Sequence, residues 1–240
     1  MHRILKGYLT GMTLQTTPAP SVSGALDTRI TVRDFLDTPV DADVLRQIIQ
    51  TALRSPSGGN LQPWKIHVMQ GKTLERFTTL ATERTLRGDQ EEPTFRAYPS
   101  PLWEPHRSWR YKLGEDMYAL LGIPREDKAG RLRWFAENAR FFGASVGMIV
   151  TGDTRLEMPQ HMDIGILLQS IMLLAREHGL HTAPQGWWRN WTSVSHEILD
   201  IDAGHHVLVG LALGHANPDA PVNSLRADRS PLEEQVRFYA

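Results

Sequence analysis

The architecture is constrained most strongly by one segment, MDIGILLQSIMLLAREHGL, at residues 162–180. Its pattern predicts a long helix that is apolar around most of its circumference, and Gly179 suits the left-handed position that follows a helix. A helix of this kind must be buried on every side. In a chain of 240 residues it therefore belongs at the centre of the fold or at a large interface between subunits.

Three apolar segments around this helix have the length and composition of strands. They are KIHVMQ at 65–70, SVGMIVTG at 145–152 and HHVLVGLALGH at 205–215. The helices predicted between and before them lie at 22–29, after the N-cap candidate Asp41, at 72–87, at 110–121 and at 126–141. A few strands separated by helices indicate a layered α+β or α/β architecture.

No composition shift marks a linker, so we predict a single domain over residues 22–240. Residues 1–21 are rich in Thr and Pro and lack periodicity, which predicts an N-terminal extension that is loose unless a partner orders it. Residues 88–109 contain several prolines and two tryptophans. A long irregular loop of this kind inside a compact domain is usually functional or mobile.

Composition argues against several classes of function. The net charge of −1 offers no electrostatic basis for binding nucleic acid or a membrane surface. The absence of cysteine excludes disulfides, thiolate catalysis and Cys-based metal sites. The chain has no run of about 18 apolar residues, and its N-terminal segment lacks the apolar core of a signal peptide. We expect a soluble, cytoplasmic protein.

Motifs of several common enzyme classes are also missing. There is no Walker loop, no G-x-G-x-x-G after a strand and no G-x-S-x-G elbow. His178 and His181 straddle Gly179, so they do not share a helix face, and no H-E-x-x-H occurs. A metal site needs three or four converging ligands, so no metal is predicted. A metal-dependent hydrolase that uses the ten histidines is kept as the alternative outside redox chemistry.

A candidate anion site begins in RITVRDF at residues 29–35. Alternate side chains of an extended segment point the same way, so Arg29, Thr31 and Arg33 share one face while the apolar residues between them face the core. Arginine binds phosphate through two parallel hydrogen bonds, and a neighbouring hydroxyl adds a further donor. The alternative is a solvated edge strand.

A second basic pair lies near the C-terminus, in NSLRADRSPL at 223–232. Arg226 and Arg229 are three residues apart and could complete the same anion site. The alternative is a solvated turn.

Two loops have compositions typical of ligand-binding segments. SPSGGNLQPW at 55–64 presents many backbone N–H groups and side-chain amides. GLHTAPQGWWRNW at 179–191 places a Pro, a Gly and three tryptophans where they can wall a flat pocket. The alternative for the tryptophans is that they cap the core where the long helix ends.

Taken in order, these segments resemble the motifs of the FMN-dependent nitroreductase family over roughly residues 26–240. The matches are RITVRDFLDTPV (29–40), SPSGGNLQPW (55–64), Asp163 with Gly165, GLHTAP (179–184), and Asn223 and Arg229 before Pro231 and Leu232. APQGWW looks most like the branch that contains nitrobenzoate reductases. The resemblance implies an α+β fold: a three-layer α/β/α sandwich with a central, mostly antiparallel sheet, assembled as an intertwined homodimer.

The resemblance also implies roles for individual residues toward FMN. Arg29, Thr31 and Arg229 would bind the phosphate with help from Arg226, and Arg33 would approach the ring and stabilise its anionic reduced form. Pro184, Gln185 and Gly186 would lie along the ring. The other subunit would contribute the remaining contacts, from Pro56, Ser57, Gly58 and Asn60.

The implied chemistry belongs to the flavin, so no catalytic side chain is predicted. NAD(P)H would pass a hydride to FMN and leave, and a nitroarene or quinone-like aromatic acceptor would then be reduced in a ping-pong cycle. Stacking on the acceptor is predicted for Trp103, Trp109, Trp187 and Trp188, with Trp191 as a further candidate.

This chain departs from many relatives, which have a Glu where Gly186 stands and a small residue where Trp187 stands. Trp187 is therefore expected to narrow the cavity over the flavin. Two alternatives keep the scaffold. One is a flavoenzyme that performs dehalogenation or dehydrogenation, and the other is a flavin-binding protein with little turnover.

Overall fold

The computed structural model describes residues 14–89, 91–93 and 95–239. The strands are β1 (Lys65–Met69), β2 (Val146–Asp153), β3 (His181–Gln185) and β4 (His205–Gly214). The helices are α1 (Val22–Thr28), α2 (Ala42–Ala52), α3 (Gly71–Arg87), α4 (His106–Leu120), α5 (Lys128–Ala136), α6 (Met158–Glu177), α7 (Thr192–Ile198) and α8 (Leu232–Gln235). Four 3₁₀ segments complete the described part: η1 (Gly58–Asn60), η2 (Glu137–Gly143), η3 (Gly186–Asn190) and η4 (Pro221–Ser224).

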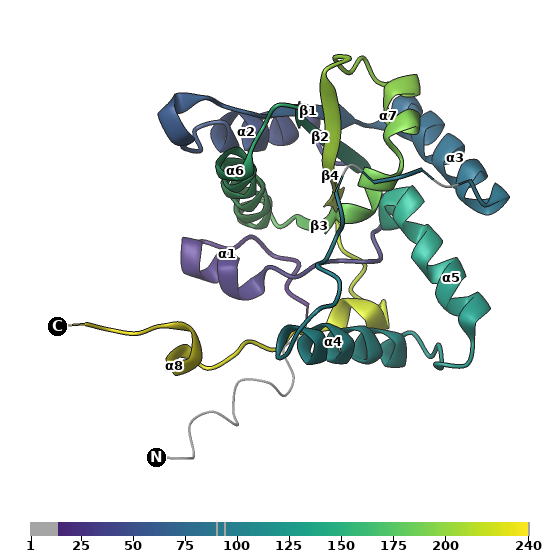
Figure 1. The fold of residues 1–240 in the computed structure, drawn as a ribbon, viewed down its shortest axis with the longest axis vertical. Coiled ribbons are helices and arrows are strands. Elements are labelled where there is room, and N and C mark those ends of the chain that lie inside the picture. Colours follow the sequence, from purple (N-terminus) through teal and green to yellow (C-terminus); the bar gives the residue numbers. More distant parts are fainter. Residues whose placement is uncertain (1–13, 90, 94, 240) are drawn as a thin grey trace.

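The four strands form one antiparallel sheet in the order β1-β2-β4-β3. Helices α2 and α6 cover one face, and α3, α7 and η2 cover the other, so the layers are those of an α/β/α sandwich (Figure 1). This confirms the predicted three-layer α+β fold with an antiparallel central sheet.

Each face of the sheet carries its own apolar core because side chains alternate along a strand. In β2, Val146, Met148 and Val150 pack toward α2 and α6, whereas Ile149 packs toward α3. The register of β2 against β4 shifts at Val150/Thr151, where a bulge falls at Leu208. The extra residue lets Leu208 join the α6 side, although an unbroken strand would turn it to the other face.

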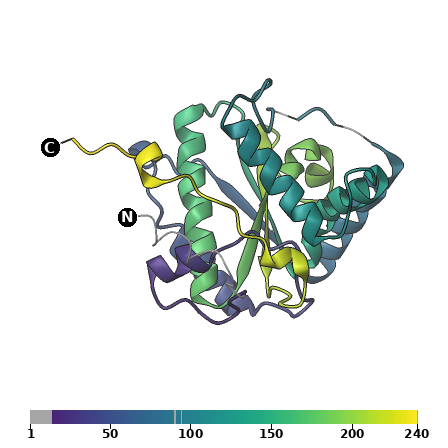
Figure 2. The ribbon, with the colours of Figure 1, turned by 90° about the horizontal axis from the view of Figure 1, so that it is seen from below.

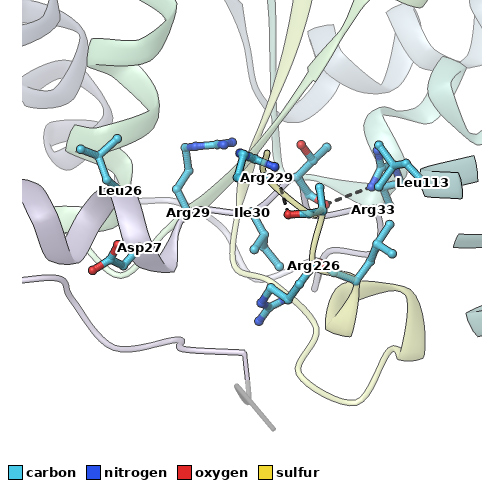
Figure 3. Close-up of a pocket in the computed structure, with 11 residues that line it drawn as sticks. Leu26, Asp27, Arg29, Ile30, Arg33, Leu113, Arg226 and Arg229 are labelled. Carbon is cyan, nitrogen blue, oxygen red and sulfur yellow. Dashed lines mark hydrogen bonds between the residues drawn. The ribbon is translucent and has the colours of Figure 1, made fainter. Parts of the chain in front are cut away.

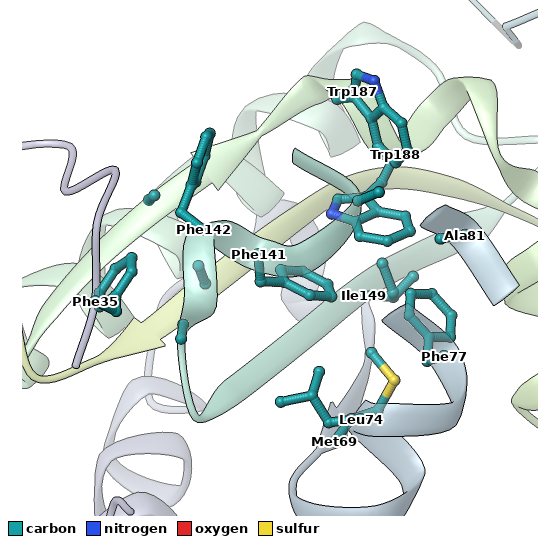
Figure 4. Close-up of a cluster of buried hydrophobic side chains, with 14 of the residues drawn as sticks. Phe35, Met69, Leu74, Phe77, Ala81, Phe141, Phe142, Ile149, Trp187 and Trp188 are labelled. Atoms are coloured by element: carbon teal, nitrogen blue, oxygen red, sulfur yellow. The ribbon is translucent and has the colours of Figure 1, made fainter. Parts of the chain in front are cut away.

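Aromatic rings fill the core on the α3 side (Figure 4). Trp188 is fully buried, and its ring centroid lies 4.6 Å from that of Phe141 and 4.9 Å from that of Phe77. A Cβ atom built on Gly210 of β4 would lie 2.0 Å from Trp188 Cδ1. Gly210 therefore makes the room that the indole occupies.

Several element bounds differ from the sequence prediction. Helix α6 begins at Met158, four residues before the predicted start, because Glu157 and Gln160 form a capping box and Pro159 occupies the first turn. Helix α4 likewise begins at His106, inside the segment predicted as a loop.

The short strand β3 was not predicted. Its sequence, HTAPQ, contains a proline and is only five residues long, but pairing with β4 over its whole length makes it a strand.

Residues 1–13 of the predicted N-terminal extension lie outside the described residues, whereas 14–21 are held by hydrogen bonds. The buried Arg176 of α6 donates to Thr17 O at 2.8 Å and accepts at its carbonyl from Ala19 N at 2.9 Å. His181 Nε2 donates to Gln15 O at 2.7 Å. The sequence predicted that this segment is loose unless a partner orders it. Within the chain, hydrogen bonds from the guanidinium of Arg176 and the imidazole of His181 hold residues 15–17.

Candidate active site

The residues of the predicted anion site surround a cavity of about 390 Å³. Arg29, Thr31 and Arg33 line the cavity, while Val32 is fully buried in the core, as the predicted alternation requires. Ile30 is also buried in the core, but it borders the cavity as well. Arg226 and Arg229 line it from the C-terminal segment (Figure 3). The two basic pairs are therefore brought together, although almost two hundred positions separate them in sequence.

Asn223 ties these two segments to each other. Its side chain is buried; Oδ1 accepts from Arg33 N at 2.9 Å, and Nδ2 donates to Asp34 O at 2.8 Å. The segment also joins the sheet, where Val32 N donates to Thr182 O of β3 at 3.1 Å. The C-terminal arginines are thus positioned by a side-chain amide and the first arginines by the sheet edge.

Among the described residues that line this cavity, arginines outnumber carboxylates. Among the described residues that line it, Asp27 alone is acidic, and within the described part of the chain Arg29, Arg33 and Arg229 form no ion pair. Burial and the nearby charge of Arg229 lower the pKa of Arg29. Desolvated guanidiniums that repel each other favour an anionic ligand between them, and phosphate suits their geometry.

A second cavity, of about 660 Å³, shares Thr31 and Arg33 with the first, so the two cavities adjoin. We call it the ring cavity. One wall is the end of β3, where Pro184, Gln185 and Gly186 lie with Trp187 after them. The facing walls are largely aromatic, with Tyr98, Tyr118, Trp134, Phe135 and Phe142. A cavity lined by arginines that adjoins a cavity with aromatic walls suits a phosphate-bearing aromatic cofactor such as FMN.

The predicted tryptophans have different environments. Trp187 lines the ring cavity and stacks on Trp191, with centroids 5.1 Å apart. Trp188 does not line the cavity, because it is fully buried beneath Trp187 in the aromatic core. It has no open face for an acceptor, so we assign it to packing.

Trp103 and Trp109 are exposed and lie on either side of His106. They line a neighbouring hollow of about 340 Å³ that shares Tyr98 and Arg110 with the ring cavity. Trp103 and Trp109 therefore lie beside the ring cavity and do not form its walls.

The loop at 55–62 lies apart from both cavities. Helix α6 holds it, through Gly58 N donating to Asp163 Oδ2 at 3.2 Å and a 2.8 Å hydrogen bond between the hydroxyls of Ser55 and Ser170. Asn60 and Gln62 adopt left-handed backbone conformations, with φ of 58° and 48°, which non-glycine residues seldom adopt. Pro56, Ser57, Gly58 and Asn60 do not line either cavity within this chain.

Sequence reasoning missed several residues of the ring cavity. Tyr98 comes from the segment predicted to be irregular, Arg110 from the start of the helix predicted at 110–121, and Asn138 from η2, where no periodic pattern points to a site. Arg189 lay inside a segment already singled out for its tryptophans, and the basic residue next to them was the signal that could have found it.

Two kinds of site find no support in the described part of the chain. No group of three or more His, Cys, Asp or Glu among the described residues could hold a metal ion. No helix there is both long and apolar enough to cross a membrane.

Comparison with known proteins agrees with this geometry. The model of the Nitroreductase family matches residues 26–215. A chloronitrobenzene nitroreductase of Comamonas testosteroni is 37% identical, over 92% of this chain and 97% of its own. A 4-nitrobenzoate reductase of Pseudomonas putida is also 37% identical, over 88% of this chain and 92% of its own.

Solved structures show the same relationship. The FMN and NADPH-dependent nitroreductase NfnB from Sphigopyxis sp. strain HMH superposes with a TM-score of 0.87 at 39% identity, covering 92% of this chain and 99% of that one. The FMN-dependent nitroreductase NfnB from Mycobacterium smegmatis, in complex with NADPH, gives 0.86 at 25% identity, covering 92% and 100%. The chain belongs to the nitroreductase family.

Proposed function

We propose that this protein is an FMN-dependent oxidoreductase that uses NAD(P)H to reduce nitroaromatic or quinone-like acceptors. The observation that carries the proposal is the pair of adjoining cavities, one lined by Arg29, Arg33 and Arg229, which form no ion pair within the described residues, and the other walled by aromatic rings. Relatives described as FMN and NADPH-dependent nitroreductases support it.

The residues of the chain would hold the cofactor from its two ends. Arg29, Arg226 and Arg229, with the Thr31 hydroxyl, suit the phosphate. Arg33 lines both cavities and suits the junction between phosphate and ring. Burial lowers the pKa of Arg33, which is the environment in which a guanidinium stabilises a neighbouring negative charge most strongly.

The ring would lie along Pro184, Gln185 and Gly186. The Gln185 side chain already makes hydrogen bonds within the chain: Nε2 donates to Asn138 O at 3.0 Å, and Oε1 accepts from Trp188 Nε1 at 3.3 Å. This side chain is therefore not free to bind a ligand. When bound, FMN supplies the redox chemistry, accepting a hydride from NAD(P)H and passing reducing equivalents to the acceptor. The side chains bind and orient, and none is assigned as an acid or base.

We propose a homodimer as the working form. The loop at 55–62 presents its donors away from the cavities of its own chain, so a second copy is needed if this loop is to reach a flavin. Met158, Met162 and Ile166 form an exposed apolar stripe on α6, although the sequence predicted burial all round. The C-terminal segment leaves the body on the side of α1 and α6 (Figures 1 and 2), with Phe238 84% exposed.

The first test is the visible spectrum of the purified protein, followed by anaerobic addition of NADPH and of NADH. A flavin spectrum that either nucleotide bleaches, and that a nitroarene or quinone restores, is the expected result. A colourless protein that FMN does not reconstitute would contradict the proposal. Bleaching without reoxidation by these acceptors would favour the flavin-binding protein with little turnover, or an enzyme of the same scaffold with different chemistry.

A further inference from the structure

The ring cavity contains an arginine that the cofactor does not account for. Arg189 lies in η3, directly after β3. It lines the ring cavity but not the first cavity, which contains Arg29 and Arg229 and which we call the phosphate cavity. A Cβ atom built on Gly186 would lie 2.6 Å from Arg189 Nη2. The missing side chain at Gly186 therefore leaves the space in which the guanidinium sits, beside the edge where the flavin ring would lie.

Arg189 has no polar partner in the described part of the chain. No hydrogen bond or ion pair of its guanidinium is found among those residues, and Nε is buried without a partner. Its Cζ lies 4.7 Å from the ring centroid of Phe95, a contact that orients the group but leaves its N–H donors unused. Burial lowers the pKa of Arg189.

The described lining of the ring cavity is basic. No carboxylate is found among the described residues that line the ring cavity, whereas Arg33, Arg110 and Arg189 all line it. Arg110 is exposed and stacks on Tyr98 at 4.5 Å, at the border with the outer hollow. A half-buried guanidinium without a counter-charge is costly, and an anionic ligand relieves that cost.

We propose that Arg189 binds the carboxylate of an aromatic acceptor seated in the ring cavity, and that the enzyme therefore prefers electron-poor aromatic carboxylates to their neutral counterparts. This inference rests on the function proposed above. The cofactor phosphate belongs to the other cavity, with Arg29, Arg226 and Arg229, so it does not occupy Arg189. The aromatic walls would hold the acceptor ring, and Arg189 would fix its charged end.

The test compares 4-nitrobenzoate with 4-nitrobenzamide, a neutral acceptor of nearly the same shape, in steady-state assays of the FMN-loaded protein. We expect Arg189→Gln to lower kcat/KM for 4-nitrobenzoate by about tenfold to a hundredfold, the range for a lost charge-assisted hydrogen bond. The value for 4-nitrobenzamide should stay nearly constant. Arg189→Lys should keep part of the preference. Arg76→Gln, which removes an exposed charge on α3, is the matched control and should keep all of it.

Binding without turnover gives a second measurement. Benzoate and benzamide are titrated into the oxidised protein and followed through the flavin absorbance. Tighter binding of benzoate, weakened by salt and lost in Arg189→Gln, is expected. Equal binding of the two by the wild-type protein would overturn the inference without any variant, so a variant that fails to fold does not leave the question open.

Arg189 could instead bind a phosphate of the nucleotide, and the reductive half-reaction separates the two. If Arg189→Gln slows flavin bleaching by NADPH far more than by NADH and leaves the benzoate preference intact, the inference is overturned in favour of nucleotide recognition. If no flavin binds or no nucleotide bleaches it, the proposed function itself fails. A working nitroreductase that is indifferent to the carboxylate contradicts only the assignment of Arg189.

Discussion

The contribution of one side chain of the phosphate cavity to FMN binding can be tested at Arg29. It is half-buried, faces Arg229 and has no carboxylate partner among the described residues. We expect Arg29→Gln to weaken FMN binding by about tenfold or more, because a charge-assisted hydrogen bond to phosphate is lost. Fluorescence titration of the apoprotein with FMN measures this. Riboflavin, which lacks the phosphate, should bind both proteins alike, and an equal loss for riboflavin would place Arg29 elsewhere.

His181 predicts a dependence of stability on pH. Burial, then the charge of Arg176, lowers its pKa from 6.5 to about 4. As the pH falls, the imidazole of His181 is protonated in the unfolded chain before it is protonated in the folded chain. The contribution of neutral His181 to the free energy of unfolding is therefore complete above about pH 6.5 and is lost as the pH falls toward 4. It amounts to about 3 kcal/mol. Urea unfolding of the wild type and of His181→Gln between pH 7.5 and 4.5 checks this.

The variant should lose stability less steeply over this range. Some slope should persist, because burial also lowers the pKa values of His67 and His206. Identical slopes for the two proteins would mean that His181 protonates without cost in the folded state.

Strand β4 and segment η3 depend on each other through Gly210. Because a Cβ there would lie 2.0 Å from Trp188 Cδ1, Gly210→Ala forces the indole or the strand to move. We expect a loss of about 1–3 kcal/mol in the free energy of unfolding, the usual cost of overpacking a core. Chemical denaturation measures it. Gly114→Ala, on α4 where a Cβ meets nothing within 4 Å, is the control and should not destabilise.

The elements that could be predicted from sequence are those with a sustained pattern. Helices α2, α3 and α6 and strands β1, β2 and β4 have clear periodicity, and all were predicted. Strand β3 was missed because five residues with a proline have no pattern of their own, and only pairing with β4 makes them a strand.

The same reasoning applies to the site. The alternation around Thr31 predicted which arginines face the ligand, but Trp188 and Trp187 are adjacent in sequence and only the fold separates core from cavity. Tyr98 could not be assigned because its significance depends on which groups surround it in space. The sequence could single out Arg189 as a basic residue beside the tryptophans, but its lack of a carboxylate partner is visible only in the fold.

Considered as a whole, the molecule has apolar surface that one copy does not cover. Ile166 is 43% exposed in the middle of α6, although the helix around it is apolar. We expect Ile166→Glu to shift the protein toward the monomer and to lower its FMN content, since a charge at the proposed contact must be desolvated. Light scattering after size exclusion gives the mass. Leu132→Glu, at an exposed position on α5, is the control. A monomeric wild type that retains FMN would contradict the homodimer.

The way in which the sheet ends has a consequence for how copies can associate. Strand β3 forms the border of the sheet. Among the described residues its outer side meets a single bridge, between Thr31 and Thr182, before Pro184 interrupts the row of backbone donors. A border strand with free N–H and C=O groups invites another chain to add to it, and proline prevents this. Edge-to-edge stacking and fibre growth are therefore blocked at this edge of the sheet, where Pro184 also lines the ring cavity.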